Sequence, residues 1–272
     1  MSSKSDLTKF CILVYCRYSR RVGSVYAIEL IMLETPIDVV FADGIPTKSK
    51  VPRYRETIYA AVKDAILSGQ LIPNQPIVEE QLAATLNVSR TPVREALALL
   101  EHDGFIGPRN GRGLYVRAIT HQEFMEMFIA NEAVEPYLAR RAARMATESQ
   151  LAAIEEAVQR ATQSAAQLDM AGFLSASRDF HRLVGEAAGN RPLAEFVLRN
   201  EERTDMYLLN YGKVVEQKRM AASVHEHRAI LGALQNRDPE AAERLVIYHA
   251  QSLRERFTQL FNEESLDDEG TP

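Results

Sequence analysis

The run from Leu82 to Val116 constrains the fold most strongly, because it orders helical and strand-like segments within a short stretch. Apolar spacing predicts three short helices, the first of them upstream of this run, followed by two strands that a glycine-rich segment joins. The predicted segments cover residues 54–68, 79–86, 89–103, 105–106 and 114–116. Three helices followed by a hairpin predict a winged helix-turn-helix domain, whose last helix can enter the major groove of DNA.

Turn and cap residues support these boundaries. Gly69 follows the first helix, where glycine is a common C-cap. Asn87-Val88 forms the turn before the third helix, and Ser89 is expected to cap that helix. Pro92 lies in its first turn, where a missing N–H costs nothing.

The third helix carries cations at its N-terminal end. Arg90 and Arg94 are four residues apart and therefore share a face, and the hydroxyl of Thr91 lies between them in sequence. The guanidinium fork suits guanine edges and phosphates alike. Arg109 and Arg112 flank the predicted wing and can reach the minor groove or phosphates. The alternative is an ordinary surface helix with solvated arginines, which the following hairpin makes the weaker interpretation.

The same residues carry a family resemblance. Residues 52–118 resemble the DNA-binding domain of the GntR family of bacterial transcriptional regulators. The matching motifs are Val88-Ser89-Arg90-Thr91-Pro92-Val93-Arg94-Glu95-Ala96-Leu97, Leu100-Glu101, Asp103-Gly104-Phe105 and Gly111-Arg112-Gly113. The resemblance implies operator contacts by Arg90, Thr91 and Arg94 and by the wing around Asn110-Gly111. With Ser89, Arg109 and Arg112, these are the predicted DNA-binding residues. Glu80 departs from the arginine that many relatives carry there, so one phosphate contact is lost and operator preference is expected to differ.

From about Thr120 the pattern is helical almost to the end of the chain, which predicts an antiparallel bundle. The predicted helices cover 121–146, 148–167, 170–188, 192–211, 214–236 and 238–262. An alanine face (Ala139, Ala142, Ala143 and Ala146) predicts close helix packing. Residues 119–272 hold 17 Lys/Arg against 25 Asp/Glu, whereas residues 51–118 hold eight against seven. A near-neutral DNA-binding part is thus expected to precede an acidic regulatory part.

Three histidines are expected to converge inside this bundle. His227 precedes the turn at Arg237-Asp238-Pro239 by ten residues, and His249 follows it by about as many, so an antiparallel helix pair places them at similar height. His181, on a third helix, completes a set suited to a metal or a ligand. The alternative is three buried or surface histidines with unrelated roles.

Residues 121–262 resemble the all-helical effector domain of the FadR-type branch of GntR regulators. The matching residues are Phe180-His181, Ala187-Ala188-Gly189-Asn190, Glu226-His227-Arg228-Ala229-Ile230 and His249. Many members bind one divalent metal, and the resemblance implies zinc or nickel on His181, His227 and His249. Ser177 occupies the position of the usual aspartate ligand, so water or effector completes the shell, or the metal binds weakly or not at all.

Effector-binding residues are expected near the same site. Asn131 stands where many relatives carry an arginine that clamps an effector carboxylate. Arg178, Arg182 or Arg203 could supply that charge instead. Together with Ser177, these residues predict a small organic acid as effector, of a less typical kind for the family.

The chain is expected to comprise a 1–50 extension that is poorly ordered or precedes the true start, a winged helix-turn-helix at 51–118, an effector and dimerisation domain at 119–263, and a polar tail at 264–272. No apolar run reaches the roughly 18 residues of a membrane span, and arginines interrupt the apolar start, which argues against a signal peptide. Cys11 and Cys16 form no CxxC motif or disulfide framework, which favours a reducing cytoplasm.

The combined prediction is a homodimeric, cytoplasmic transcriptional repressor that binds double-stranded operator DNA and responds to an effector; it is not an enzyme. Two alternatives stay open. One is a regulator that senses acyl-CoA without a metal, and the other is a metallohydrolase that uses the three histidines and a water.

Overall fold

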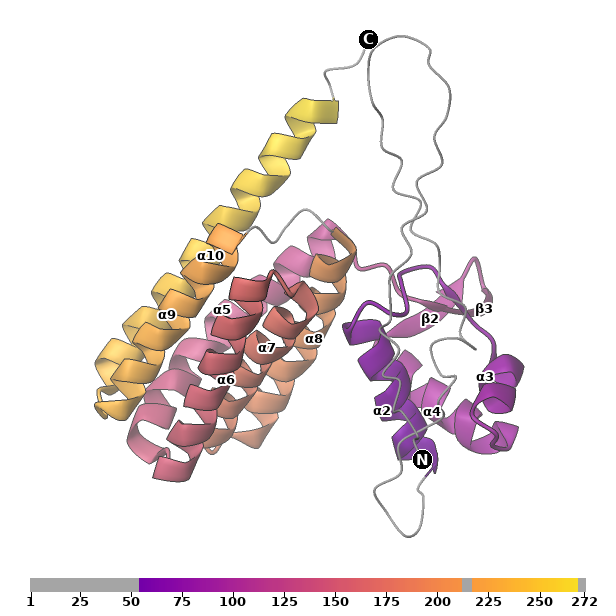
Figure 1. The fold of residues 1–272 in the computed structure, drawn as a ribbon, viewed down its shortest axis with the longest axis horizontal. Helices are drawn as coiled ribbons and strands as arrows, with labels where there is room; N and C mark the ends of the chain where they lie inside the picture. Colours follow the sequence, from indigo (N-terminus) through magenta and orange to yellow (C-terminus); the bar gives the residue numbers. More distant parts are fainter. Residues whose placement is uncertain (1–53, 212–216, 269–272) are drawn as a thin grey trace, which may run out of the picture. The chain divides into compact units, whose positions relative to one another are not determined.

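The computed structural model describes residues 54–211 and 217–268, so the expected 1–50 extension lies outside the described residues. The predicted fold class is confirmed. Three helices and a small sheet form a winged helix-turn-helix, and six longer helices form an antiparallel bundle (Figure 1). None of the helices over these ranges combines the length and apolar character that a membrane span requires.

The winged helix-turn-helix comprises α2 (Tyr54–Leu67), α3 (Glu79–Thr85) and α4 (Arg90–His102), followed by β2 (Ile106–Arg109) and β3 (Arg112–Val116). An additional strand, β1 (Pro76–Ile77), pairs antiparallel with β3 and gives the strand order β1-β3-β2. The sequence predicted a loop there, because two residues next to prolines carry no detectable period. Strand β1 anchors the segment between α2 and α3 to the wing.

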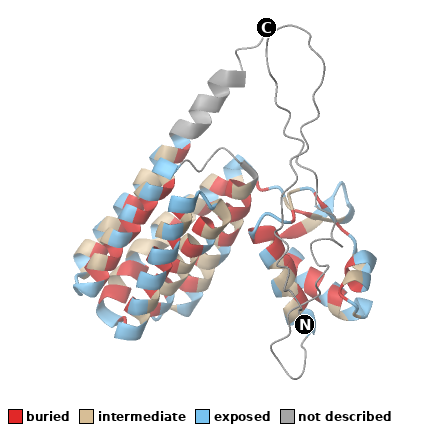
Figure 2. Ribbon diagram, viewed as in Figure 1, coloured by how far each residue is buried: buried red, intermediate tan, exposed pale blue. Residues whose placement is uncertain are grey.

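Helix α4 is amphipathic. Val93, Leu97 and Leu100 are buried at a spacing of three to four residues. Figure 2 shows buried and exposed residues alternating around the short helices of this domain. Because one face of α4 is held in the core, the opposite face presents Arg90 and Arg94 to solvent.

The bundle contains α5 (His121–Met145), α6 (Glu148–Gln167), α7 (Met170–Ala187), α8 (Arg191–Tyr211), α9 (Gln217–Gln235) and α10 (Pro239–Asp268). Helix α10 extends six residues beyond the predicted end at 262, into the segment expected to be a polar tail. Capping explains the start of α5, where the Thr120 hydroxyl accepts from the Glu123 N–H and the Glu123 carboxylate accepts from the Thr120 N–H.

Small residues bring the bundle helices close together. The predicted alanine face of α5 is buried, with Ala139, Ala142 and Ala143 completely inaccessible. A Cβ at Gly185 on α7 would lie 2.9 Å from the Cβ of Ala194 on α8, so this crossing requires glycine. Helix α5 packs against α7, α8, α9 and α10, which makes it the central element around the histidines.

Candidate nucleic-acid interface and candidate metal centre

Helix α4 begins at the predicted place, but its cap differs from the prediction. Ser89 is the N-cap residue with extended backbone, yet its side chain makes no capping hydrogen bond. The expectation that its hydroxyl caps the helix is therefore wrong, although the helix boundary is right. Ser89, Arg90 and Thr91 are all exposed, so this helix end is accessible to a large ligand.

A single carboxylate holds both arginines of this helix. Arg90 Nε donates to Glu79 Oε1 at 2.9 Å, and Arg94 Nη2 donates to the same oxygen at 3.2 Å. The hydrogen bonds from Arg94 and Arg90 lower the pKa of Glu79, so it is ionised at neutral pH. The arginine side chains remain 58% and 69% exposed. They can leave Glu79 without disturbing the core.

The wing presents its predicted residues to solvent. Arg109, Asn110, Gly111 and Arg112 are all exposed at the turn between β2 and β3. Asn110 and Gly111 have positive φ angles of 53° and 70°, the conformation that two-residue hairpin turns require. The two arginines therefore flank a tight turn, a suitable shape for insertion into a DNA groove.

Replacing Glu79 by glutamine is expected to tighten DNA binding modestly. DNA must displace Glu79 from Arg90 and Arg94, and exposed ion pairs contribute little because water screens them, so the gain in affinity is expected to be only about 1.5- to 5-fold. Fluorescence anisotropy with operator DNA measures it. Thr85→Ala, also on α3, is the control. Weaker binding by the Glu79→Gln protein would show that Glu79 helps to orient the arginines.

The three predicted histidines converge. His181 comes from α7, His227 from α9 and His249 from α10, and one ring nitrogen of each lies within 4.8 Å of the others. His227 is 0% exposed and His249 is 2% exposed. The Nε2 atoms of His227 and His249 lie 3.3 Å apart. The predicted positions of these residues are thus confirmed in space.

Carboxylates contact the outer nitrogens of two of these rings. Glu135 Oε1 lies 2.5 Å from His181 Nδ1, and Glu226 Oε2 lies 2.7 Å from His249 Nδ1. Burial lowers the pKa of His181, but the charges of Glu135 and Glu201 outweigh burial and raise that pKa to about 9. Burial lowers the pKa of His227 and of His249 below the ordinary value, so both are neutral.

The donor set fits a borderline metal ion. Two nitrogens bound to one tetrahedral zinc at about 2.0–2.1 Å each lie roughly 3.3–3.4 Å apart, the spacing of the Nε2 atoms of His227 and His249. His227 Nδ1 is buried without a hydrogen-bond partner among the described residues.

An 80 Å³ cavity adjoins the histidines. Helices α5, α7, α8, α9 and α10 line it, and both aromatic rings and polar groups are among the lining side chains. Asn131 and Ser177 face it as predicted, next to His181 and His249. Asn131 Nδ2 donates to Glu201 Oε1 at 2.8 Å. The asparagine therefore offers the cavity a hydrogen-bond donor without a charge, and that donor is paired with a carboxylate.

The arginines expected to bind an effector lie elsewhere. Arg178 is paired with Asp205, Arg182 bonds to Asp179 and Glu186, and Arg203 faces Glu123. None of the three belongs to the cavity lining within 54–211 and 217–268. Arg219 and Arg256 line it instead. The prediction of Arg178 and Arg203 as cavity residues is therefore not supported, because their acidic partners on neighbouring helices take up their charges.

Several residues of these sites were not found from the sequence: Glu79, Glu135, Glu201, Glu226, Arg219 and Arg256. Glu226 immediately precedes His227, and this adjacency is the one local signal that pointed toward the cluster. The others lie far in sequence from the residues they contact, and only the packing of the helices brings them together.

Comparison with known families agrees with this architecture. Residues 54–116 match the model of the bacterial regulatory proteins of the gntR family, and residues 126–252 match that of the FCD domain. The chain is 32% identical over 218 residues to an uncharacterized HTH-type transcriptional regulator, YdfH, of Escherichia coli O6:H1, covering 79% of this chain and 93% of that protein. It is 32% identical over 214 residues to the HTH-type transcriptional repressor RspR of Escherichia coli K12, covering 77% and 91%.

The fold is also similar to solved structures. E. coli McbR/YncC aligns with a TM-score of 0.66 at 20% identity, over 77% of this chain and 99% of that one. A protein from Rhodococcus sp. RHA1 that is described as a transcriptional regulator GntR aligns with a TM-score of 0.65 at 21% identity, over 76% of this chain and 99% of that one. At these identities the likeness concerns the fold alone.

Proposed function

The chain belongs to the GntR family of bacterial transcriptional regulators and carries an FCD domain, and from this premise we propose that it is an effector-controlled repressor. The observation that supports DNA binding best is the exposed N-terminal end of α4, with Arg90, Thr91 and Arg94, beside an exposed wing. The relative RspR is named a repressor, which supports repression here.

We propose that a homodimer places two α4 helices in successive major grooves, about 34–36 Å apart on a palindromic operator. Arg90 and Arg94 exchange Glu79 for guanine edges or phosphates. Arg109 and Arg112 contact the adjacent DNA backbone or the minor groove. Because a protein that binds operator DNA works where the bacterial chromosome lies, we also propose that it is cytoplasmic. The Glu80 side chain supplies no phosphate contact, so the operator differs from those read by relatives with arginine there.

The cavity of the bundle is the proposed effector site. Its lining combines cationic and hydrogen-bonding side chains, which favours a small organic acid as the effector. A carboxylate is expected to face Arg219 and Arg256, while Asn131 and Ser177 donate hydrogen bonds. The effector changes DNA affinity only if it binds one arrangement of the dimer better than the other.

We propose that His181, His227 and His249 hold one zinc or nickel ion. When bound, the metal supplies a Lewis-acid contact for an oxygen of the effector. The neutral rings of His227 and His249 offer lone pairs for this purpose. The neighbouring carboxylates of Glu135 and Glu226 bond to imidazoles, so we assign the cluster to sensing and not to hydrolysis.

Fluorescence anisotropy with promoter DNA of the regulator's own gene and its neighbours tests the proposed function. We expect specific binding, and release when a screened organic acid stabilises the protein in thermal shift. Equal affinity for promoter and unrelated DNA would contradict the role of repressor. Effector control would be contradicted if compounds that stabilise the protein left its affinity for DNA unchanged.

Restoring a carboxylate at position 177 is expected to strengthen metal binding. Ser177 lines the cavity beside His181, one helical turn away on α7. Aspartate there adds a ligand, and we expect zinc affinity to rise roughly tenfold or more, since even outer-shell partners change affinity about 10- to 100-fold. Competition with a chromogenic chelator measures it, with Ser177→Asn as the uncharged control. An unchanged affinity would place the metal away from α7.

A further inference from the structure

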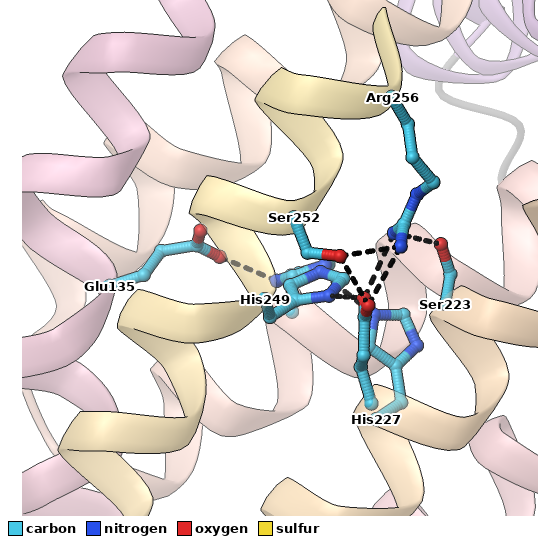
Figure 3. A network of polar contacts seen from close by, with 8 residues as sticks. Glu135, Ser223, His227, His249, Ser252 and Arg256 are labelled. Atoms are coloured by element: carbon cyan, nitrogen blue, oxygen red, sulfur yellow. Dashed lines mark hydrogen bonds and ion pairs between the residues drawn. The ribbon is translucent and has the colours of Figure 1, made fainter.

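Glu226 is the centre of a buried polar network between α9 and α10. Its Oε2 accepts from His249 Nδ1 at 2.7 Å, and Arg256 donates to both of its oxygens at 2.7 and 2.9 Å. Ser252 Oγ donates to Oε1 at 2.8 Å, and Arg256 also reaches Ser223 Oγ (Figure 3). Three different side chains therefore hold this carboxylate, and Glu226 itself is only 7% exposed.

This network determines the protonation of His249. Arg256 donates to both oxygens of Glu226, a bidentate pairing that holds this carboxylate in its ionised form. An ionised carboxylate can only accept, so His249 Nδ1 carries the proton. The neutral ring then has its lone pair on Nε2, the atom 3.3 Å from Nε2 of His227.

We propose that Glu226 is a positioning residue for the metal centre, which holds His249 in the tautomer and orientation that metal binding requires. This inference rests on the metal site of the proposed function. It also offers a reason why the site can function with serine at 177, since an outer carboxylate raises the basicity of a ligating imidazole.

The same network connects the metal centre to the effector cavity. Arg256 grips Glu226 and also lines the cavity, as does His249. An anionic group in the cavity competes with Glu226 for Arg256 and thereby alters the hydrogen bond between Glu226 and His249. Coupling of this kind is reciprocal, so metal and effector change each other's affinity by the same factor.

The test compares Glu226→Gln with Glu243→Gln. Glu243 is the matched control, because it also pairs with an arginine, Arg140, at 2.5 Å, but neither lines the cavity nor contacts a histidine of the cluster in the described residues. Chelator competition with zinc and with nickel is expected to show a roughly 10- to 100-fold weaker affinity for Glu226→Gln and an unchanged one for Glu243→Gln. Glu226→Asp, which keeps the charge but shortens the reach, is expected to fall between them.

Nitrogen-15 NMR of the metal-free protein gives a second readout that a purely structural role would not move. We expect His249 as the Nδ1–H tautomer in the wild type and in Glu243→Gln, and a shift toward Nε2–H in Glu226→Gln. Wild-type affinity in both Glu226 variants, or an unchanged His249 tautomer, would overturn the positioning role alone. Failure of the wild-type chain to bind zinc or nickel would refute the metal proposal itself, and the positioning role with it.

Discussion

Replacing Arg90 and Arg94 together by alanine is expected to weaken operator binding by roughly 2–6 kcal/mol, or about 30- to 25,000-fold. Each well-formed bidentate arginine contact is worth about 1–3 kcal/mol. Both side chains are largely exposed and bond within the described structure only to Glu79, so the fold should not depend on them. Fluorescence anisotropy at several salt concentrations measures the loss, and the salt dependence should become shallower where phosphate contacts are removed.

The matched control for the double variant is Arg191→Ala. Arg191 is an exposed arginine on α8 of the bundle, paired with Glu195 much as Arg90 is with Glu79. It removes a surface cation without touching the predicted DNA interface. Unaltered operator affinity of the double variant, with an unchanged thermal unfolding midpoint, would show that α4 does not read DNA.

The His227→Ala substitution is expected to abolish stabilisation by metal. A metal present at one hundred times its Kd raises the free energy of unfolding by about 2.7 kcal/mol when it binds only the folded chain. His227 is buried and shares the cluster with His181 and His249, so its loss removes a ligand at the centre of the site. The measured quantity is the shift of the thermal midpoint on adding zinc. Because each variant is compared with itself, the stability that alanine loses by leaving a cavity does not enter this shift.

His225→Ala is the control for this variant. His225 lies two residues earlier on α9 and is exposed, so it changes the same helix and removes the same side chain without entering the cluster. We expect it to keep the full zinc-dependent shift. An undiminished shift in His227→Ala would place the metal outside the three-histidine cluster.

The spacing of apolar residues along the sequence was sufficient to predict the long helices. Helices α5 to α9 lie within a few residues of their predicted bounds where both are described, because apolar spacing, caps and the break at Gly189 are local signals. The meeting of His227 and His249 was likewise predictable, since equal distances from a turn determine relative height in a helix pair. Strand β1 was not, because two residues carry no period and its pairing with β3 is a tertiary effect.

The polar partners of the sites were not predictable for a different reason. Glu79 reaches arginines 11 and 15 positions away, and Glu226 contacts His249 and Arg256 on the next helix. Which side chains meet across two helices depends on rotation about each axis, which periodicity defines too coarsely. For the same reason, nothing local indicated that Arg178 is paired with Asp205 instead of facing the cavity.

The carboxylate on Arg90 and Arg94 has a consequence for the sequence of events when the protein meets DNA. Glu79 cancels one of the two positive charges of Arg90 and Arg94, whereas Arg109 and Arg112 form no ion pair in the part of the chain that the structure describes. Because electrostatic attraction steers the encounter step, we expect the wing to make the first contact with DNA. We expect the helix to engage afterwards, once a phosphate or guanine comes near enough to replace Glu79. Encounter and reading would then be separate steps, with the wing acting first and the helix second.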